Sequence, residues 1–322
     1  MRIFTSIWMV IVFAIVLLGV RLDNNDYVKT LRYKTWDYFQ KVSPRTKVSD
    51  AVTVINITEA DLKRYGQWPW PRHIVAAVHQ KLITYGAGVV NYNILFAEPD
   101  RMSGVEYLKS MPMPNEYREQ LAQVLLDTDG VFALIMKDSA NAILMMSVKN
   151  EADQNLPSVT QIIKKGDVLP WLYEYAGILP PHSRIMAGAT GVGVNVTSPE
   201  PDAVVRKMPM LINVGGKIYP SMIVENVRFV FGSKRIKVVA NESGIKEILV
   251  NKSNGVPVNQ NGEMYINYAD PKKYVQMSVT ELMSDDIDVT KIQNKMIVIG
   301  LDAAGLSVLK YTPHGLTTDQ MI

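Results

Sequence analysis

The sequence predicts an α/β fold: a mostly parallel sheet covered by helices, with an antiparallel β meander, preceded by one transmembrane helix. Three observations predict it. Apolar runs at Ala51–Ile57 and Ala87–Leu95 flank a helical pattern, which is the order of a βαβ unit. Turn signals recur between residues 242 and 262, as in a meander. The uncharged run Ile3–Val20 would form a helix of about 27 Å, close to the thickness of a bilayer's hydrocarbon core.

We interpret residues 1–22 as an uncleaved anchor and residues 23–322 as the body. The apolar run is longer than a usual signal core, and no small-x-small cleavage site follows it. Only Arg2 precedes the run, whereas Arg21, Lys29, Arg32 and Lys34 follow it, which opposes the usual cytoplasmic excess of positive charge. Long domains are translocated with little regard to charge, so both a body outside the membrane and a tethered cytoplasmic body stay open.

Composition excludes several classes of function. The chain has 322 residues, a net charge of +3 and no cysteine, which excludes disulfides, thiol catalysis and cysteine-ligated metals. Basic residues are scattered, so no nucleic acid partner is predicted. The histidines lack the spacing that places two metal ligands on one helix face, and we predict no metal and no cofactor. Glycines 188, 191 and 193 do not form a dinucleotide fingerprint, and we expect them to relieve crowding instead.

The elements follow in order along the chain. A helix through Leu31 and Tyr38 is expected to end before Ser43-Pro44. A second helix is predicted from Arg72 to Tyr85, with Pro71 at its first position. The later predictions are a helix over Asn115–Leu126, strands at Val131–Ile135 and Ala142–Met146, little periodicity over Lys149–Pro181, a helix capped by Ser221, turns at Glu242–Gly244, Ser253–Gly255 and Gln260–Gly262, and a strand over Met296–Gly300.

Polar and aromatic residues follow the predicted strands and form the candidate site. The carboxyl ends of parallel strands open on one edge of a sheet, where ligands usually bind. Tryptophans offer a stacking face and an arginine offers an anion partner. The candidate ligand-binding residues are Trp68, Trp70, Arg72, Asn93, Glu98 and Asp100, with Asn56, Glu59 and Asp302 as secondary candidates; no catalytic residue is predicted.

Other interpretations of the same residues stay open. Trp68 and Trp70 would also serve to cover the open end of the core, and acidic loop residues also serve solubility. A rival function is a membrane-anchored periplasmic hydrolase using Asp302 or His314, although no nucleophile arrangement is recognisable. A third is an envelope interaction module whose tryptophan face docks protein.

The sequence resembles a known family along nearly its whole length. The most specific marks are Gly66–Arg72 followed by Asn93–Asp100. The other shared segments are Leu31–Asp37, Asn56–Glu59, Tyr85–Val90, Pro201–Arg206, Tyr219–Ser221, Ile266–Tyr268, Ile297–Gly300, Ala303–Gly305 and Thr312-Pro313. Together they are similar to the type-two CHASE domain, the extracellular sensor of bacterial nucleotide cyclases, diguanylate cyclases and histidine kinases.

The resemblance implies a sensor and not an enzyme. It implies an N-terminus inside the cell, an inner-membrane anchor, a periplasmic body, an unknown small-molecule or protein signal, and a homodimer. The family pattern continues into membrane helices and a catalytic domain, so the resemblance implies a chain truncated before its output. The family usually has aspartate where Asn56 and Asn93 stand, and commonly one near Ser307 and Val308, which weakens any role in binding a cation.

Overall fold

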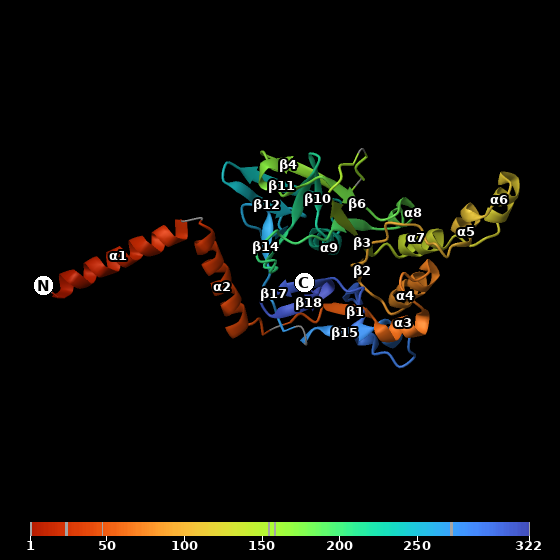
Figure 1. Ribbon diagram of the computed structural model, residues 1–322, viewed down its shortest axis with the longest axis horizontal. Coiled ribbons are helices and arrows are strands. Elements are labelled where there is room, and N and C mark those ends of the chain that lie inside the picture. The colour runs from red at the N-terminus through yellow and green to blue at the C-terminus, as the bar shows by residue number, and fades with distance from the viewer. Residues whose placement is uncertain are drawn as a thin grey trace.

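The computed structural model describes residues 2–22, 25–46, 48–153, 155–157, 159–270 and 273–321. Helix α1 (Arg2–Leu22) extends away from the body, and α2 (Asp26–Val42) returns beside it (Figure 1). Side chains of α1 are described over residues 7–19. Among the described residues, no helix is both long enough and apolar enough to cross a membrane. The predicted anchor is therefore still a prediction, whereas the helix ending before Ser43-Pro44 is confirmed.

The central sheet is mostly parallel, as predicted. Its strands run in the order β15, β1, β16, β2, β3, β7, and each neighbouring pair is parallel. Their bounds are β1 (Val52–Thr58), β2 (Val89–Tyr92), β3 (Ala142–Lys149), β7 (Gly191–Val194), β15 (Val275–Ser278) and β16 (Met296–Asp302). A further strand, β6 (Gly177–Leu179), pairs antiparallel with the end of β3. The late strand β16 lies between β1 and β2, so distant parts of the chain meet at the centre.

Helices cover one face of this sheet with a large apolar core. Residues of α3 (Glu59–Tyr65), α4 (Arg72–Thr84), α7 (Thr128–Ser139) and α10 (Val279–Leu282) belong to this core. Leu82 of α4 and Phe132 of α7 are fully buried against Ile55 and Ile297 of the strands. The predicted helix from Arg72 is confirmed. Pro71 lies one residue earlier than expected, at the N-cap, where its missing N–H costs no helical hydrogen bond.

A second, smaller core lies beyond β7. It is built on the sheet β13-β12-β11-β4 and on α9 (Met222–Val230), whose first turn Ser221 caps as predicted. The strands of this part are β4 (Gln161–Lys165), β5 (Glu174–Tyr175), β8 (Lys207–Pro209), β9 (Leu211–Val214), β10 (Lys217–Pro220), β11 (Arg235–Asn241), β12 (Gly244–Leu249), β13 (Gly255–Val256) and β14 (Glu263–Tyr265). A Cβ on Gly193 would lie 2.5 Å from the backbone nitrogen of Met222, so glycine does relieve crowding there.

The remaining elements are short. They are α5 (Gly104–Ser110), α6 (Asn115–Ala122), α8 (Ser183–Met186), β17 (Leu309–Thr312), β18 (Gly315–Thr318) and the three-ten turns η1 (Leu169–Trp171), η3 (Val289–Lys291) and η4 (Asp319–Met321). Helices α5 and α6 form an arm that extends from the body (Figure 1). The helix predicted over Asn115–Leu126 thus ends four residues early.

Three predictions need correction. The segment Val131–Ile135 is part of helix α7, not a strand, because the Asp127 carboxylate accepts a hydrogen bond from Gly130 N at 3.1 Å and starts a helix. The segment between Lys149 and Pro181 contains short strands, which pair only with distant partners. The meander is partial: two hairpins join β11, β12 and β13, but β14 pairs with β8 instead.

Candidate functional site

A cavity of about 330 Å³ lies against the face of the central sheet that α4 does not cover. Strand residues alternate between the two faces, so Val54 and Val298 face this cavity while their neighbours Ile55 and Ile299 face the helices. The first turn of α9, with Met222 and its neighbours, forms the opposite wall. We call this space the sheet cavity. Its volume falls within the range of small-ligand pockets.

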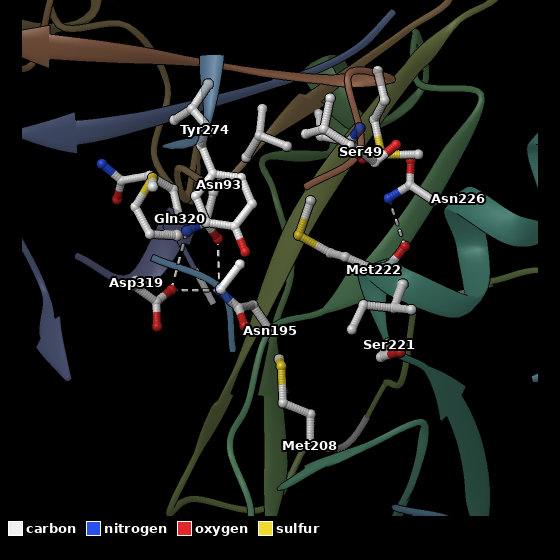
Figure 2. Close-up of a pocket in the computed structure, with 18 of the residues that line it drawn as sticks. Ser49, Asn93, Asn195, Met208, Ser221, Met222, Asn226, Tyr274, Asp319 and Gln320 are labelled. Carbon is white, nitrogen blue, oxygen red and sulfur yellow. Dashed lines mark hydrogen bonds between the residues drawn. The ribbon is translucent and has the colours of Figure 1, made fainter. Parts of the chain in front are cut away.

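One side of the sheet cavity carries a hydrogen-bonded group of three polar side chains. Asn93 Nδ2 donates to Asp319 Oδ2 at 3.0 Å, and Asn195 Nδ2 donates to Asn93 Oδ1 at 2.6 Å and also to Asp319 Oδ2 (Figure 2). The other carboxylate oxygen of Asp319 lies 4.0 Å from Lys310 Nζ. The negative charge of Asp319 is therefore already compensated by the protein.

Two amide oxygens of residues that line the sheet cavity have no hydrogen-bond partner in the described part of the chain. Asn91 is 1% exposed and Asn226 is 9% exposed. Their nitrogens donate to Ile297 O at 3.2 Å and to Met222 O at 2.8 Å, which fixes the orientation of each amide. Each Oδ1 accepts no hydrogen bond from the described part of the chain. Figure 2 shows Asn226 on the side of the cavity away from Asn93 and Asp319.

Both end segments of the body contribute to the walls. Arg45, Val48 and Ser49 follow α2, and the turn η4 comes from the other end of the described chain. Gln320 of η4 packs directly on β16, because a Cβ on Gly300 would lie only 2.6 Å from its side chain. The sheet cavity is thus in contact with residues from both ends of the body.

Of the predicted ligand-binding residues, Asn93 lines the sheet cavity. Asn56 lies beside it: its Nδ2 donates to Gln276 Oε1 at 3.0 Å, and its Oδ1 accepts from Gln320 Nε2 at 3.0 Å. The amides at these two positions therefore hold polar neighbours on the same face of the sheet. Asn56 lies in β1 and Asn93 directly follows β2. Both strands were predicted to lie in one parallel sheet, so the sequence predicted that the two residues lie at the same sheet edge.

The tryptophans lie on the opposite face. Trp70 is 1% exposed, and its Nε1 donates to Gly66 O at 2.7 Å. The Trp68 ring contacts it edge-on at 5.7 Å and is half-buried against the same core. Both line a void of about 10 Å³, the size of roughly one water-sized probe. This geometry is that of a cover over the core, the alternative named from the sequence.

Arg72 and Asp100 belong to a buried polar cluster with Asp129 and Thr128. Arg72 N and Thr128 Oγ1 donate to Asp100 Oδ2 at 2.7 and 2.6 Å. The Arg72 guanidinium lies 3.3 Å from Asp129 Oδ1 and stacks 4.7 Å from the Phe96 ring centroid. Burial lowers the pKa of Arg72, and the charges of Asp129 and Asp100 oppose that shift. The cluster ties the starts of α4 and α7 together.

The other predicted residues lie apart from the sheet cavity. Glu98 is exposed and pairs with Arg101 at 2.9 Å, while Glu59 Oε1 accepts from Ala304 N at 2.7 Å. Asp302 is exposed at the end of β16. His314, the alternative hydrolase residue, is half-buried with its ring 6.3 Å from that of Tyr268.

The sequence reasoning assigned no role to a buried clamp on α2. Arg206 is 1% exposed, and its guanidinium donates to both carboxylate oxygens of Asp37, at 2.7 and 2.8 Å. It also donates to Asp202 at 2.7 and 2.8 Å and lies 4.6 Å from the Tyr33 ring centroid. One cation thus binds two carboxylates and an aromatic ring, and it fixes α2 to the body.

A signal for this clamp was present in the sequence. Asp37 lies in the shared segment Leu31–Asp37, and Asp202 and Arg206 lie in the shared segment Pro201–Arg206. The two segments are far apart in the chain and meet only in the fold. Nearby, Gln40 Oε1 accepts from Tyr268 N at 3.1 Å, which adds a second attachment of α2.

Metal ligands and charged side chains contribute little to this site. Within the described ranges, no group of three or more histidine, aspartate or glutamate side chains could hold a metal ion. The charged residues among those lining the sheet cavity are Arg45, which is exposed at the rim, and the compensated Asp319. The arrangement is suited to binding through apolar contact and neutral hydrogen bonds.

The described chain is thus an α/β body with a ligand-sized cavity and a buried ion pair that attaches helix α2 to it. A family model of the CHASE2 domain matches residues 10–322, and the chain belongs to that family. CHASE2 is a family of extracellular sensor domains found in signalling proteins. The resemblance to type-two CHASE domains is thereby confirmed. No curated protein and no solved structure matches the chain.

Proposed function

We propose that this chain is the signal-sensing part of a membrane-bound bacterial receptor whose output is a nucleotide cyclase, a diguanylate cyclase or a histidine kinase. Residues 1–22 anchor it in the inner membrane, and residues 23–322 form the sensor in the periplasm. The uncharged run Ile3–Val20 and the outward-extending helix α1 support the anchor.

The observation that carries this proposal is the clamp of Arg206 on Asp37. A sensor must convert a change in its body into a displacement at the membrane, which requires a mechanical link. Helix α2 follows the anchor after a few residues, and the buried guanidinium of Arg206 joins it to the body. Because desolvated charge-assisted bonds are strong and directional, α2 would follow a shift of the segment that carries Arg206.

The test uses a chimera in which this chain precedes the membrane helices and cyclase domain of a receptor of the same family. It is expressed in a bacterium that lacks its own adenylate cyclase, and cyclic AMP is measured. Asp37→Asn weakens the clamp while leaving Asp202 to hold Arg206. We expect the output to change by about 5-fold or more. The matched control is Asp50→Asn, because the Asp50 side chain is 94% exposed.

Cells that express this chain without the added output domain report where the body lies. The chain has no cysteine, so Ser253→Cys in the exposed turn between β12 and β13 introduces a single thiol. A membrane-impermeant maleimide should label it in intact cells, whereas a cysteine placed ahead of residue 1 should react only after lysis. Equal outputs from Asp37→Asn and Asp50→Asn at equal protein levels would reject the mechanical link, and labelling only after lysis would reject the periplasmic placement.

A further inference from the structure

We infer that the sheet cavity binds a small uncharged molecule that has an apolar body and hydrogen-bond-donating groups, such as hydroxyl or amide N–H groups. This inference rests on the proposed sensor function and assigns its ligand site and ligand class. It places the ligand between the central sheet and α9, on the face opposite to Trp68 and Trp70.

The apolar part of the ligand follows from the lining. Val54 and Val298 on the sheet, and Met208 and Met222 on the other side, surround the cavity. Methionine side chains adapt to the shape of an apolar ligand because they are unbranched and flexible. An apolar ligand body would remove this surface from water, which favours binding.

The donor groups follow from Asn91 and Asn226. Their Oδ1 atoms are buried acceptors that the described chain leaves unpaired, and a buried acceptor without a partner is destabilising. Both amide nitrogens are committed to backbone carbonyls, so the amides cannot turn to offer donors without losing those bonds. A ligand that brings O–H or N–H groups would satisfy both oxygens.

The ligand should carry no net charge. The carboxylate of Asp319 already accepts bonds from Asn93 and Asn195 and lies near Lys310, so it needs no cationic ligand. Arg45, the other charged residue that lines the cavity, is exposed to solvent. A charged ligand would lose its hydration without gaining a buried partner, which is costly.

Binding here would reach both end segments directly. A ligand in the sheet cavity would touch Val48 and Ser49, which follow α2, and also Met321 of η4. The ligand would thereby act on the segment next to the clamped helix and on the last turn. This position distinguishes the sheet cavity from the void beneath the tryptophans.

The experiment is methyl NMR of the full chain in nonionic detergent, with 13C-labelled methionine. The probe is hexane-1,6-diol, and its matched analogues are hexan-1-ol, adipate and hexane-1,6-diamine, which share the chain length but differ in donors or charge. We expect saturable shifts of the Met208, Met222 and Met296 methyls with the diol, weaker binding of hexan-1-ol, and no saturable shift with the charged analogues. Met136, fully buried in the helix-covered core, and the exposed Met102 serve as internal controls.

Substitutions sharpen the result. Asn226→Leu keeps the branching of the side chain but removes its acceptor and its donor to Met222 O, and it should weaken the binding of the diol by about 2- to 10-fold. Asn150→Leu, at an exposed position after β3, should leave the affinity unchanged. The inference is overturned if the diol shifts none of the cavity methyls saturably, if it shifts Met102 and Met136 equally, or if adipate or the diamine binds as well as the diol.

This experiment and the chimera fail independently. NMR titration reports occupancy of the sheet cavity and needs neither an anchor nor an output domain. If the chimera responds to Asp37→Asn but the diol does not shift the cavity methyls, the proposed sensor function stands and this ligand site is rejected. Binding of the diol in a chain whose chimera is silent would keep the site and reject the coupling.

Discussion

His79 is a buried histidine that the fold keeps neutral. It is fully buried on α4, with Nδ1 3.0 Å from the Tyr92 hydroxyl and Nε2 3.0 Å from the Ser139 hydroxyl. Burial lowers its pKa to about 4, because the charged imidazolium would lose its hydration. The ring therefore contributes packing and two neutral hydrogen bonds between α4, β2 and α7.

This burial predicts a loss of stability in mild acid. The unfolded histidine titrates near pH 6.5, so between about pH 6.5 and 4 the unfolded state binds a proton that the folded state refuses. The free energy of unfolding is highest above pH 6.5. It should decrease as the pH is lowered through this window, by up to about 3 kcal/mol. The measurement is the urea midpoint of the full chain at pH 7.5 and pH 5.

Two variants isolate the contribution of His79. His79→Gln should be less stable at pH 7.5 but should lose much less stability on acidification. His73→Gln changes an exposed histidine on the same helix and should retain the loss seen in the original chain. An equal loss in His79→Gln and the original chain would contradict the assignment.

At the residue scale, the sequence predicted which residues are structurally important better than it predicted what each of them does. Asn93 was predictable because it follows an apolar strand, and it does line the sheet cavity. Arg72 and Asp100 were chosen for their charge, but their cluster is closed by Asp129, whose position depends on α7. Arg206 and Asp37 are 169 residues apart, and no local pattern announces such a pair.

At the scale of elements, the contact of α9 with β7 shapes the sheet cavity. A Cβ on Gly193 would lie 2.5 Å from both the nitrogen and the Cα of Met222, and these are backbone atoms that cannot turn aside. Gly193→Ala should therefore push α9 outward and destabilise the chain by about 1–3 kcal/mol. Chemical denaturation of the full chain measures this change.

The control for this substitution is Gly19→Ala in α1, where a Cβ would meet nothing within 4 Å. It should leave the unfolding of the body unchanged. Since Met222 and Asn226 lie on the displaced helix, Gly193→Ala should also weaken the binding of hexane-1,6-diol. Unchanged stability in Gly193→Ala would show that α9 does not pack on β7 as closely as the structure has it.

The elements differ in how far the sequence determines them. Strands β1 and β2 and the core of β16 were predictable because their apolar runs match a sheet buried on both faces. Helix α7 was missed because β-branched Val131 and Ile135 favour a strand locally, whereas the Asp127 cap and the burial of Phe132 and Met136 favour a helix. Strand β4 (Gln161–Lys165) has two half-buried isoleucines between exposed polar residues, too short a pattern to predict, and its pairing with β11 forms the strand.

At the scale of the whole molecule, α2 has one face against the body and one exposed apolar face. Tyr33, Asp37 and Gln40 face the body, as their contacts show. Tyr27, Leu31, Tyr38 and Val42 lie within about 60° of one another on the opposite side, because a helix turns by about 100° per residue. Their exposed fractions are 86%, 61%, 62% and 56%. An apolar stripe of this kind is typical of a helix that pairs with another helix.

We expect two copies of the chain to pair through this stripe, as the homodimer expected for a receptor requires. Leu31→Cys places one thiol at the middle of the stripe in a chain that has no other cysteine. Oxidation in membranes should give a disulfide-linked dimer, since facing Cα atoms within about 7 Å can be bridged. Lys252→Cys, in the turn between β12 and β13, should give no disulfide-linked dimer under the same conditions.

A dimer through α2 would allow the clamp to transmit a change in one body to the other copy. Each α2 would contact its own body through Arg206 and the other α2 through the stripe, so a shift of one body would alter the pairing of the two α2 helices. Tyr38 lies seven residues beyond Leu31 on the same stripe. Tyr38→Cys should therefore cross-link as Leu31→Cys does, because the two copies share one orientation. Equal cross-linking of Lys252→Cys and Leu31→Cys would mean random collision, and signalling would then have to pass through single helices.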